Sequence, residues 1–168
     1  MPRHAGVKTM QDLAHLVADY IRNSCDGQCD IVGESFGGWI ALWLAVLHPD
    51  LVGQMVLEAP AGLREGGQGG LPEDAQERLK ALHAHPELAP VEKRSEQVLL
   101  GNRKAVAEYT GGIAFDSDLA ARLGDVQARM LVLMGTQDRI IPADSGRLLK
   151  ARVRNSHLTY IWDAAHAL

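Results

Sequence analysis

Residues 33–37 have the sequence G-E-S-F-G, which places a serine between two glycines in the pattern G-x-S-x-G. A serine hydroxyl is presented for nucleophilic attack when it projects from a sharp, strained strand-to-helix turn. Glycines two residues before and two residues after Ser35 remove side chains that would collide in such a turn. The backbone N–H of Phe36, at the start of the following helix, can donate to an oxyanion. The pattern therefore predicts Ser35 as a nucleophile and Phe36 as an oxyanion donor.

A serine nucleophile needs a base, and the base needs a carboxylate that orients it. Asp138 lies three residues after Gly135, where an apolar run ends. His166 lies four residues after Trp162, where the last apolar run ends. We therefore predict a catalytic triad in which His166 is the base of Ser35 and Asp138 is the acid that orients His166.

The elements that must position these side chains follow from the apolar patterns. Thr9 and Asp12 form a capping box before a helical pattern. Four apolar runs predict strands, at residues 29–33, 54–57, 130–134 and 157–162. Helices are predicted over residues 10–24, 39–47 and 142–153. Strands that alternate with helices predict an α/β fold with a parallel sheet.

The amino-acid composition changes between the second and third predicted strands. This stretch starts with clustered glycines and continues with polar segments that predict short helices over residues 72–85, 90–100, 104–109 and 116–123. The sequence therefore predicts a core formed by residues 1–60 and 126–168, with residues 61–125 as a helical insertion.

Three segments resemble the α/β-hydrolase superfamily: residues 32–38 its nucleophile elbow, 131–142 its acid-bearing segment and 163–166 its histidine loop. The chain order Ser, Asp, His is also the order of that family. The resemblance covers nearly the whole chain. It implies a partial α/β-hydrolase fold, a parallel sheet flanked by helices, with residues 61–125 as a cap over the active site. Serine at position 35 favours esterases, carbon–carbon bond hydrolases and serine-dependent haloperoxidases over haloalkane dehalogenases and epoxide hydrolases.

The resemblance also implies parts that this chain lacks. Family members have several strands before the helix predicted over residues 10–24, and a loop among them supplies a second oxyanion donor. The chain stops two residues after His166, before the closing helix of the family, and Ala165 stands where the family usually has Gly. We therefore expect a fragment or truncated form of a longer protein, with the strand at residues 29–33 as an exposed edge that favours aggregation.

The predicted activity is hydrolysis of an ester-like or related carbonyl substrate through an acyl-enzyme, with no metal or organic cofactor. Glu58, at the end of the strand at residues 54–57, is an alternative acid. Asp144 is another rival, although it should already lie on the helix at residues 142–153. The alternative function is a non-catalytic ligand-binding module or an inactive truncated fragment.

The composition of the chain argues against some classes of binding partner. The chain has 168 residues, 46% of them hydrophobic and 23% charged, which is typical of a soluble globular domain. A net charge of -4 argues against nucleic acid and anionic membranes as partners. The longest apolar run, residues 39–47, is shorter than the about 20 residues that span a bilayer. With no secretory signal visible at the start, we expect a cytoplasmic protein that binds a small-molecule substrate, and the oligomeric state stays open.

Possible metal ligands are sparse. Cys25 and Cys29 have no further Cys or His at ligand spacing, so we expect reduced thiols. His83 and His85 lie two apart on a predicted helix and would point in different directions, which makes them a poor metal pair.

Overall fold

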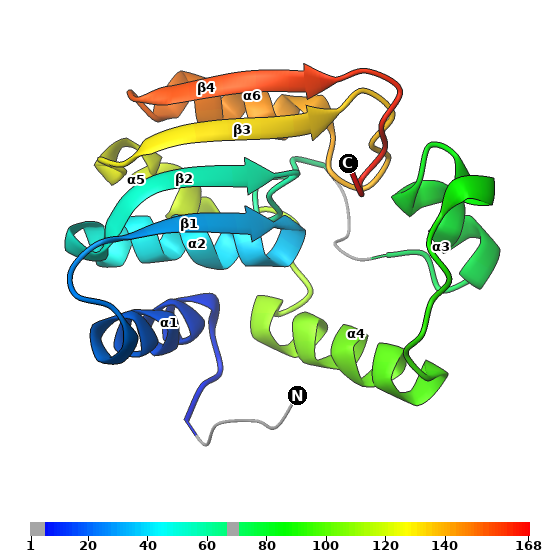
Figure 1. Ribbon diagram of the computed structural model, residues 1–168, viewed down its shortest axis with the longest axis horizontal. Helices are drawn as coiled ribbons and strands as arrows, with labels where there is room; N and C mark the ends of the chain where they lie inside the picture. The colour runs from blue at the N-terminus through cyan, green and yellow to red at the C-terminus, as the bar shows by residue number, and fades with distance from the viewer. Residues whose placement is uncertain (1–5, 67–70) are drawn as a thin grey trace.

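The computed structural model describes residues 6–66 and 71–168. A parallel four-stranded sheet lies at its centre, in the order β1-β2-β3-β4 (Figure 1). The strands are Cys29–Glu34 (β1), Val52–Glu58 (β2), Arg129–Gly135 (β3) and Ser156–Ile161 (β4). The predicted α/β fold with a parallel sheet is confirmed. Since the strands are parallel, their carboxyl ends share one edge of the sheet, where ligand sites of such sheets form.

Six α-helices connect and cover the strands in the described part of the chain. They are Met10–Ser24 (α1), Ser35–Leu47 (α2), Ala75–Leu82 (α3), Glu96–Thr110 (α4), Ser117–Arg122 (α5) and Ala143–Arg152 (α6). The predicted capping box is present, because Thr9 Oγ1 accepts from the Asp12 N–H while the Asp12 carboxylate accepts from the Thr9 N–H. None of these helices is long and apolar enough to cross a bilayer. The chain start predicted to lack a secretory signal (1–5) and most of the predicted glycine-rich stretch (67–70) lie outside the described residues.

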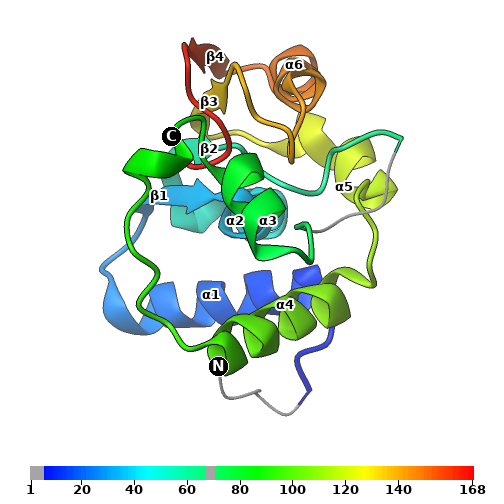
Figure 2. The ribbon, with the colours of Figure 1, turned by 90° about the vertical axis from the view of Figure 1, so that its right-hand side faces the viewer.

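Helices α2, α5 and α6 cover the same face of the sheet (Figure 2). Helix α2 is buried on most sides, as its uniformly apolar sequence predicts, and α1 packs against it. Over the opposite face no helix lies among the described residues (Figure 2). Val32 alternates along β1 with the buried Gly33, and its side chain is 76% exposed. Strand β1 is also an edge of the sheet, as expected. Among the described residues, one face of the sheet is therefore uncovered, and β1 and β4 form its two edges.

The segment between β2 and β3 carries α3 beyond the carboxyl ends of the strands (Figures 1 and 2). Residues 90–100 and 104–109, predicted as two helices, differ from the prediction: residues 90–95 are not helical, and α4 runs unbroken through Gly101. Helix α4 contains no buried residue, so no apolar stripe marked its course in the sequence. In α5 and the turn after it, by contrast, Leu119 and Leu123 are fully buried.

A buried carboxylate fixes α5 to α2. Asp116 Oδ2 accepts hydrogen bonds from the indole N–H groups of Trp39, at 2.9 Å, and Trp43, at 2.8 Å. Its Oδ1 accepts from the Leu119 N–H and so caps α5, one residue before the helix begins. Because both indole donors and the carboxylate are satisfied, this polar group is compatible with the core.

Candidate active site

Strand β1 runs directly into α2, and Ser35, the first residue of α2, stands at the strand-to-helix junction. Its φ angle is +49°, a left-handed conformation that is uncommon for residues other than glycine. The Ser35 carbonyl accepts from the Ala61 N–H at 2.9 Å, which holds the turn to the chain after β2. The strained strand-to-helix turn expected for Ser35 is therefore present at the carboxyl edge of the sheet.

The glycines around this turn do not all serve the same purpose. A Cβ at Gly33 would lie 2.9 Å from the Gly37 carbonyl oxygen and from the Gly38 Cα, so a side chain does not fit there. A Cβ at Gly38 would lie 2.7 Å from Pro60 Cβ. At Gly37, however, a Cβ would meet no described atom within 4 Å. The prediction that the second glycine of the motif avoids a collision was wrong, and the crowded position is Gly38, one residue later.

Asp138 lies in the loop after β3 and is held by that loop. Its Oδ1 accepts from the backbone N–H groups of Ile140, at 2.8 Å, and Ile141, at 2.9 Å. An Asp that bonds the backbone two and three residues ahead forms a compact local turn. This turn leaves the second carboxylate oxygen, Oδ2, free to point toward the loop after β4.

The structure brings the three predicted side chains together. His166 Nδ1 lies 3.0 Å from Asp138 Oδ2, and His166 Nε2 lies 2.9 Å from Ser35 Oγ. The Asp138 and His166 side chains are 1% and 3% exposed. A carboxylate only accepts hydrogen bonds, so it selects the tautomer with the proton on Nδ1 and leaves Nε2 to accept from the serine hydroxyl. The arrangement can draw a proton from Ser35 toward His166.

The two alternative acids do not contact His166. Glu58 Oε1 accepts from the Leu168 N–H at 3.0 Å, and Asp144 pairs with Arg147 on the surface of α6. The carboxylate at His166 is therefore that of Asp138. Phe36 is the second residue of α2, where a backbone N–H has no partner within the helix. Its role as an oxyanion donor stays a prediction.

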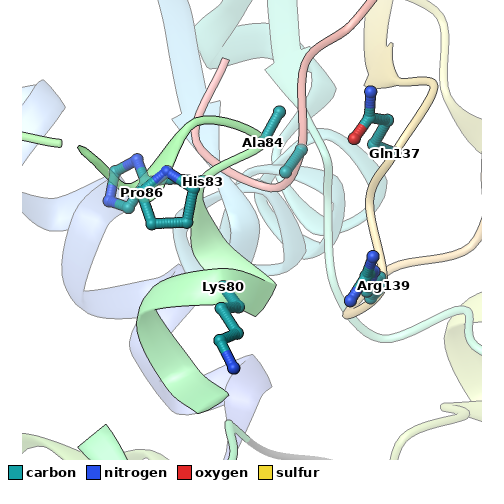
Figure 3. A pocket seen from close by; sticks show the side chains of 7 residues that line it. Lys80, His83, Ala84, Pro86, Gln137 and Arg139 are labelled. Carbon is teal, nitrogen blue, oxygen red and sulfur yellow. The ribbon is translucent and has the colours of Figure 1, made fainter. Parts of the chain in front are cut away.

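A pocket of about 210 Å³ adjoins these loops, between α3 with its following turn and the segments that carry Asp138 and His166 (Figure 3). Its lining residues are Lys80, His83, Ala84, Pro86, Gln137, Arg139 and Ala165. Arg139 directly follows Asp138, and Ala165 directly precedes His166. Ser35 is not among the lining residues.

The pocket is bordered by cationic and neutral groups. Lys80 pairs with Glu77 at 2.9 Å on the exposed side of α3. In the part of the chain that the structure describes, the side chains of Arg139 and His83 have no hydrogen-bond or ion-pair partner. The sequence analysis predicted no role for Arg139. No motif indicates this residue, because the pocket is formed by segments that are distant along the chain.

The sequence analysis predicted no metal site in this chain. Among residues 6–66 and 71–168, no three His, Cys, Asp or Glu side chains gather as metal ligands would. No disulfide joins Cys25 and Cys29.

Comparisons with known proteins agree on one family. The model of the alpha/beta hydrolase family matches residues 2–168. A 2-hydroxy-6-oxo-6-phenylhexa-2,4-dienoate hydrolase from Comamonas testosteroni is 26% identical over 158 residues, which cover 81% of this chain and 55% of that protein. A 2-hydroxymuconate semialdehyde hydrolase from Pseudomonas putida is 30% identical over 157 residues, which cover 83% of this chain and 56% of that protein. The chain thus spans little more than half the length of these curated relatives.

Solved structures show the same fold. A 2-hydroxy-6-oxo-6-phenylhexa-2,4-dienoate hydrolase from a Rhodococcus species superposes with a TM-score of 0.75 at 19% identity, covering 99% of this chain and 68% of that one. A serine hydrolase involved in carbazole degradation gives a TM-score of 0.76 at 22% identity, covering 98% of this chain and 67% of that one.

Proposed function

The chain belongs to the alpha/beta hydrolase family, and we propose that it carries the catalytic triad of a serine hydrolase. The observation that carries this proposal is the continuous set of contacts from Asp138 through His166 to Ser35, at 3.0 and 2.9 Å. A nucleophile in contact with a base, and a base in contact with an orienting carboxylate, form the geometry of acyl transfer.

The reaction proceeds in two steps. Ser35 Oγ attacks the substrate carbonyl carbon while His166 Nε2 takes the hydroxyl proton. His166 then gives this proton to the leaving group, an alcohol from an ester or a carbon acid from a ketone, and an acyl-enzyme remains. Water attacks the acyl group, His166 takes the proton of the water, and the carboxylic acid leaves as Ser35 is restored. Asp138 holds the imidazole tautomer throughout, and the Phe36 N–H donates to the oxyanion.

The pocket beside the triad supports one class of substrate. Arg139 offers a guanidinium that no described residue pairs, with His83 and Lys80 nearby, and a guanidinium binds carboxylates in a two-pronged geometry. The relatives are named for dienoate substrates that carry a carboxylate and an oxo group. These two observations support an acidic carbonyl compound as the substrate of this site.

Hydrolysis of two p-nitrophenyl esters, the neutral acetate and the acidic hemisuccinate, tests both parts of the proposal. The chain should release p-nitrophenol from each above the rate of buffer, and Ser35→Ala should return both rates to that background. Arg139→Gln should raise the KM for the hemisuccinate about tenfold, because one charge-assisted contact is lost. The KM for the acetate should change little.

Other outcomes are equally informative. Equal rates for the chain and its Ser35→Ala variant would contradict the triad. Equal KM changes for both esters in Arg139→Gln would contradict the acidic substrate class. A chain without turnover that binds a small ligand tightly would favour the non-catalytic module.

A further inference from the structure

One carboxylate, that of Asp163, joins the loop of His166 to two other segments. Asp163 Oδ2 lies 2.7 Å from His85 Nε2, in the turn after α3. Asp163 Oδ1 accepts from the side-chain amide of Gln137, the residue before Asp138. We propose that Asp163 is a positioning residue of the triad and that His85 clamps the α3 segment to it. The inference rests on the proposed role of His166 as base.

The backbone around Asp163 fixes where its carboxylate lies. Its φ angle is +57°, in the left-handed region that Asp tolerates better than most residues. The Asp163 N–H donates to Thr136 Oγ1 at 3.0 Å, and the Thr136 N–H donates to the Ile161 carbonyl at 3.0 Å. The Gln137 N–H donates to the Ala164 carbonyl at 2.8 Å. The loops after β3 and β4, which carry Asp138 and His166, are therefore fastened together at Asp163.

A second contact joins the α3 segment to the same loop on the other side of His166. The Ala167 N–H donates to the carbonyl of Leu82, the last residue of α3, at 2.8 Å. With the contact between His85 and Asp163, the segment of residues 82–85 holds the His166 loop both before and after the imidazole. The same segments line the pocket of Figure 3. A shift of the α3 segment would therefore change both the position of His166 and the width of the pocket.

The contact depends on the charge of His85. Two carboxylates face this imidazole, Asp163 at Nε2 and Glu87 at Nδ1, the latter at 3.5 Å. A protonated imidazole has two N–H groups and can donate to both, whereas a neutral one has a single N–H. The hydrogen bond to Asp163 and its negative charge raise the pKa of His85 above its ordinary value.

The sign of the pH dependence follows from this raised pKa. The contact between His85 and Asp163 is strongest below about pH 6.5, the usual pKa of an unfolded histidine. It weakens as pH rises through the higher pKa that His85 has in the folded chain.

Three variants of the full 168-residue chain test the inference: Asp163→Asn, His85→Gln and the control Glu87→Gln. In NMR titrations, Asp163→Asn should lower the midpoint of His85 more than Glu87→Gln does. The side chains of His85 and Asp163 are 49% and 46% exposed, so solvent weakens their contact. In hydrogen exchange, corrected for intrinsic rates, the Ala167 amide should exchange about two- to fivefold faster in Asp163→Asn and His85→Gln than in the wild type. Glu87→Gln should leave this exchange near the wild-type rate.

The rate at which a fluorophosphonate labels Ser35 supplies a readout that a purely structural role would not move. The ratio of the wild-type rate to the His85→Gln rate should be largest at low pH, about two- to fivefold for a half-exposed contact, and approach one as His85 loses its proton. Because both chains contain the same triad, the ratio removes the part of the pH dependence that the two chains share.

Each result decides the question. An unchanged His85 midpoint in Asp163→Asn, or unchanged Ala167 exchange together with a ratio that is flat with pH, would overturn the inference. A wild-type chain that is not labelled at all would contradict the proposed function instead, and the His85 midpoint and the Ala167 exchange would still decide whether Asp163 clamps the two segments.

Discussion

At the scale of residues, the site depends on backbone positions that exclude a side chain. Gly135, the last residue of β3, faces the loop that carries His166. A Cβ at this position would collide with the carbonyl oxygens of Ala164 and Ala165. Since both atoms are backbone, rotation of a side chain cannot relieve the collision, and the loop itself must move.

Gly135→Ala should therefore displace His166 and slow fluorophosphonate labelling of Ser35 about 100-fold, the cost of a shift near 1 Å in a catalytic group. It should also lower the free energy of unfolding by about 1 to 3 kcal/mol, as overpacking does. Gly101→Ala is the control, because a Cβ there meets no described atom within 4 Å. Equal labelling rates for the two variants would show that the His166 loop does not depend on Gly135.

The proximity of Ser35, Asp138 and His166 could be predicted because each lies just after a strand that its apolar run reveals. Ser35 follows β1, Asp138 follows β3 and His166 follows β4, and a parallel sheet brings these ends to one edge. The contact of His85 with Asp163 could not be predicted, since 78 residues separate the two and both lie in turns without periodicity.

At the scale of elements, burial decides what the sequence reveals. The strands and α2 are apolar because they form the core, so their positions were predicted within a few residues. Helix α4 has no buried residue, and Gly101 within it resembles a break because glycine disfavours helices by about 1 kcal/mol. A helix without an apolar stripe offers no periodic signal, and two shorter helices were predicted in its place.

Asp116 is the polar residue on which the attachment of α5 depends. Asp116→Ala would leave two buried indole N–H groups without an acceptor and remove the cap of α5. We expect the free energy of unfolding to fall by about 2 to 4 kcal/mol, the sum of charged hydrogen bonds and a lost cap. Urea unfolding followed by tryptophan fluorescence measures this loss. Asp118→Ala, on the exposed first turn of α5, should cost less than about 1 kcal/mol, and a cost as large as that of Asp116→Ala would contradict the argument.

At the scale of the whole molecule, the helices α2, α5 and α6 cover one face of the sheet, and over the other face no helix lies among residues 6–66 and 71–168 (Figure 2). The chain also spans about 55% of its curated relatives. An open face beside an edge strand offers unpaired backbone groups and apolar side chains to a second chain. We therefore expect the chain to self-associate through this surface.

Val32, 76% exposed on the edge strand β1, tests that expectation. Val32→Thr keeps a β-branched side chain but reduces the apolar surface. We expect aggregation, followed by light scattering, to begin at a higher temperature, with a change in unfolding free energy below about 0.5 kcal/mol. The matched change Val132→Thr, at a fully buried position of β3, should instead cost about 1 to 3 kcal/mol. Identical aggregation of Val32→Thr and the wild type would exclude this face as the site of association.

The central claim, that Ser35 is a nucleophile activated by His166 and Asp138, is tested most directly by covalent labelling. The chain is incubated with a fluorophosphonate probe, digested, and the modified peptide is identified by mass spectrometry. The account predicts a single adduct on Ser35, absent in Ser35→Ala and formed more slowly by at least about 100-fold in His166→Ala. An adduct on another residue, or labelling of Ser35 at the wild-type rate without His166, would contradict it.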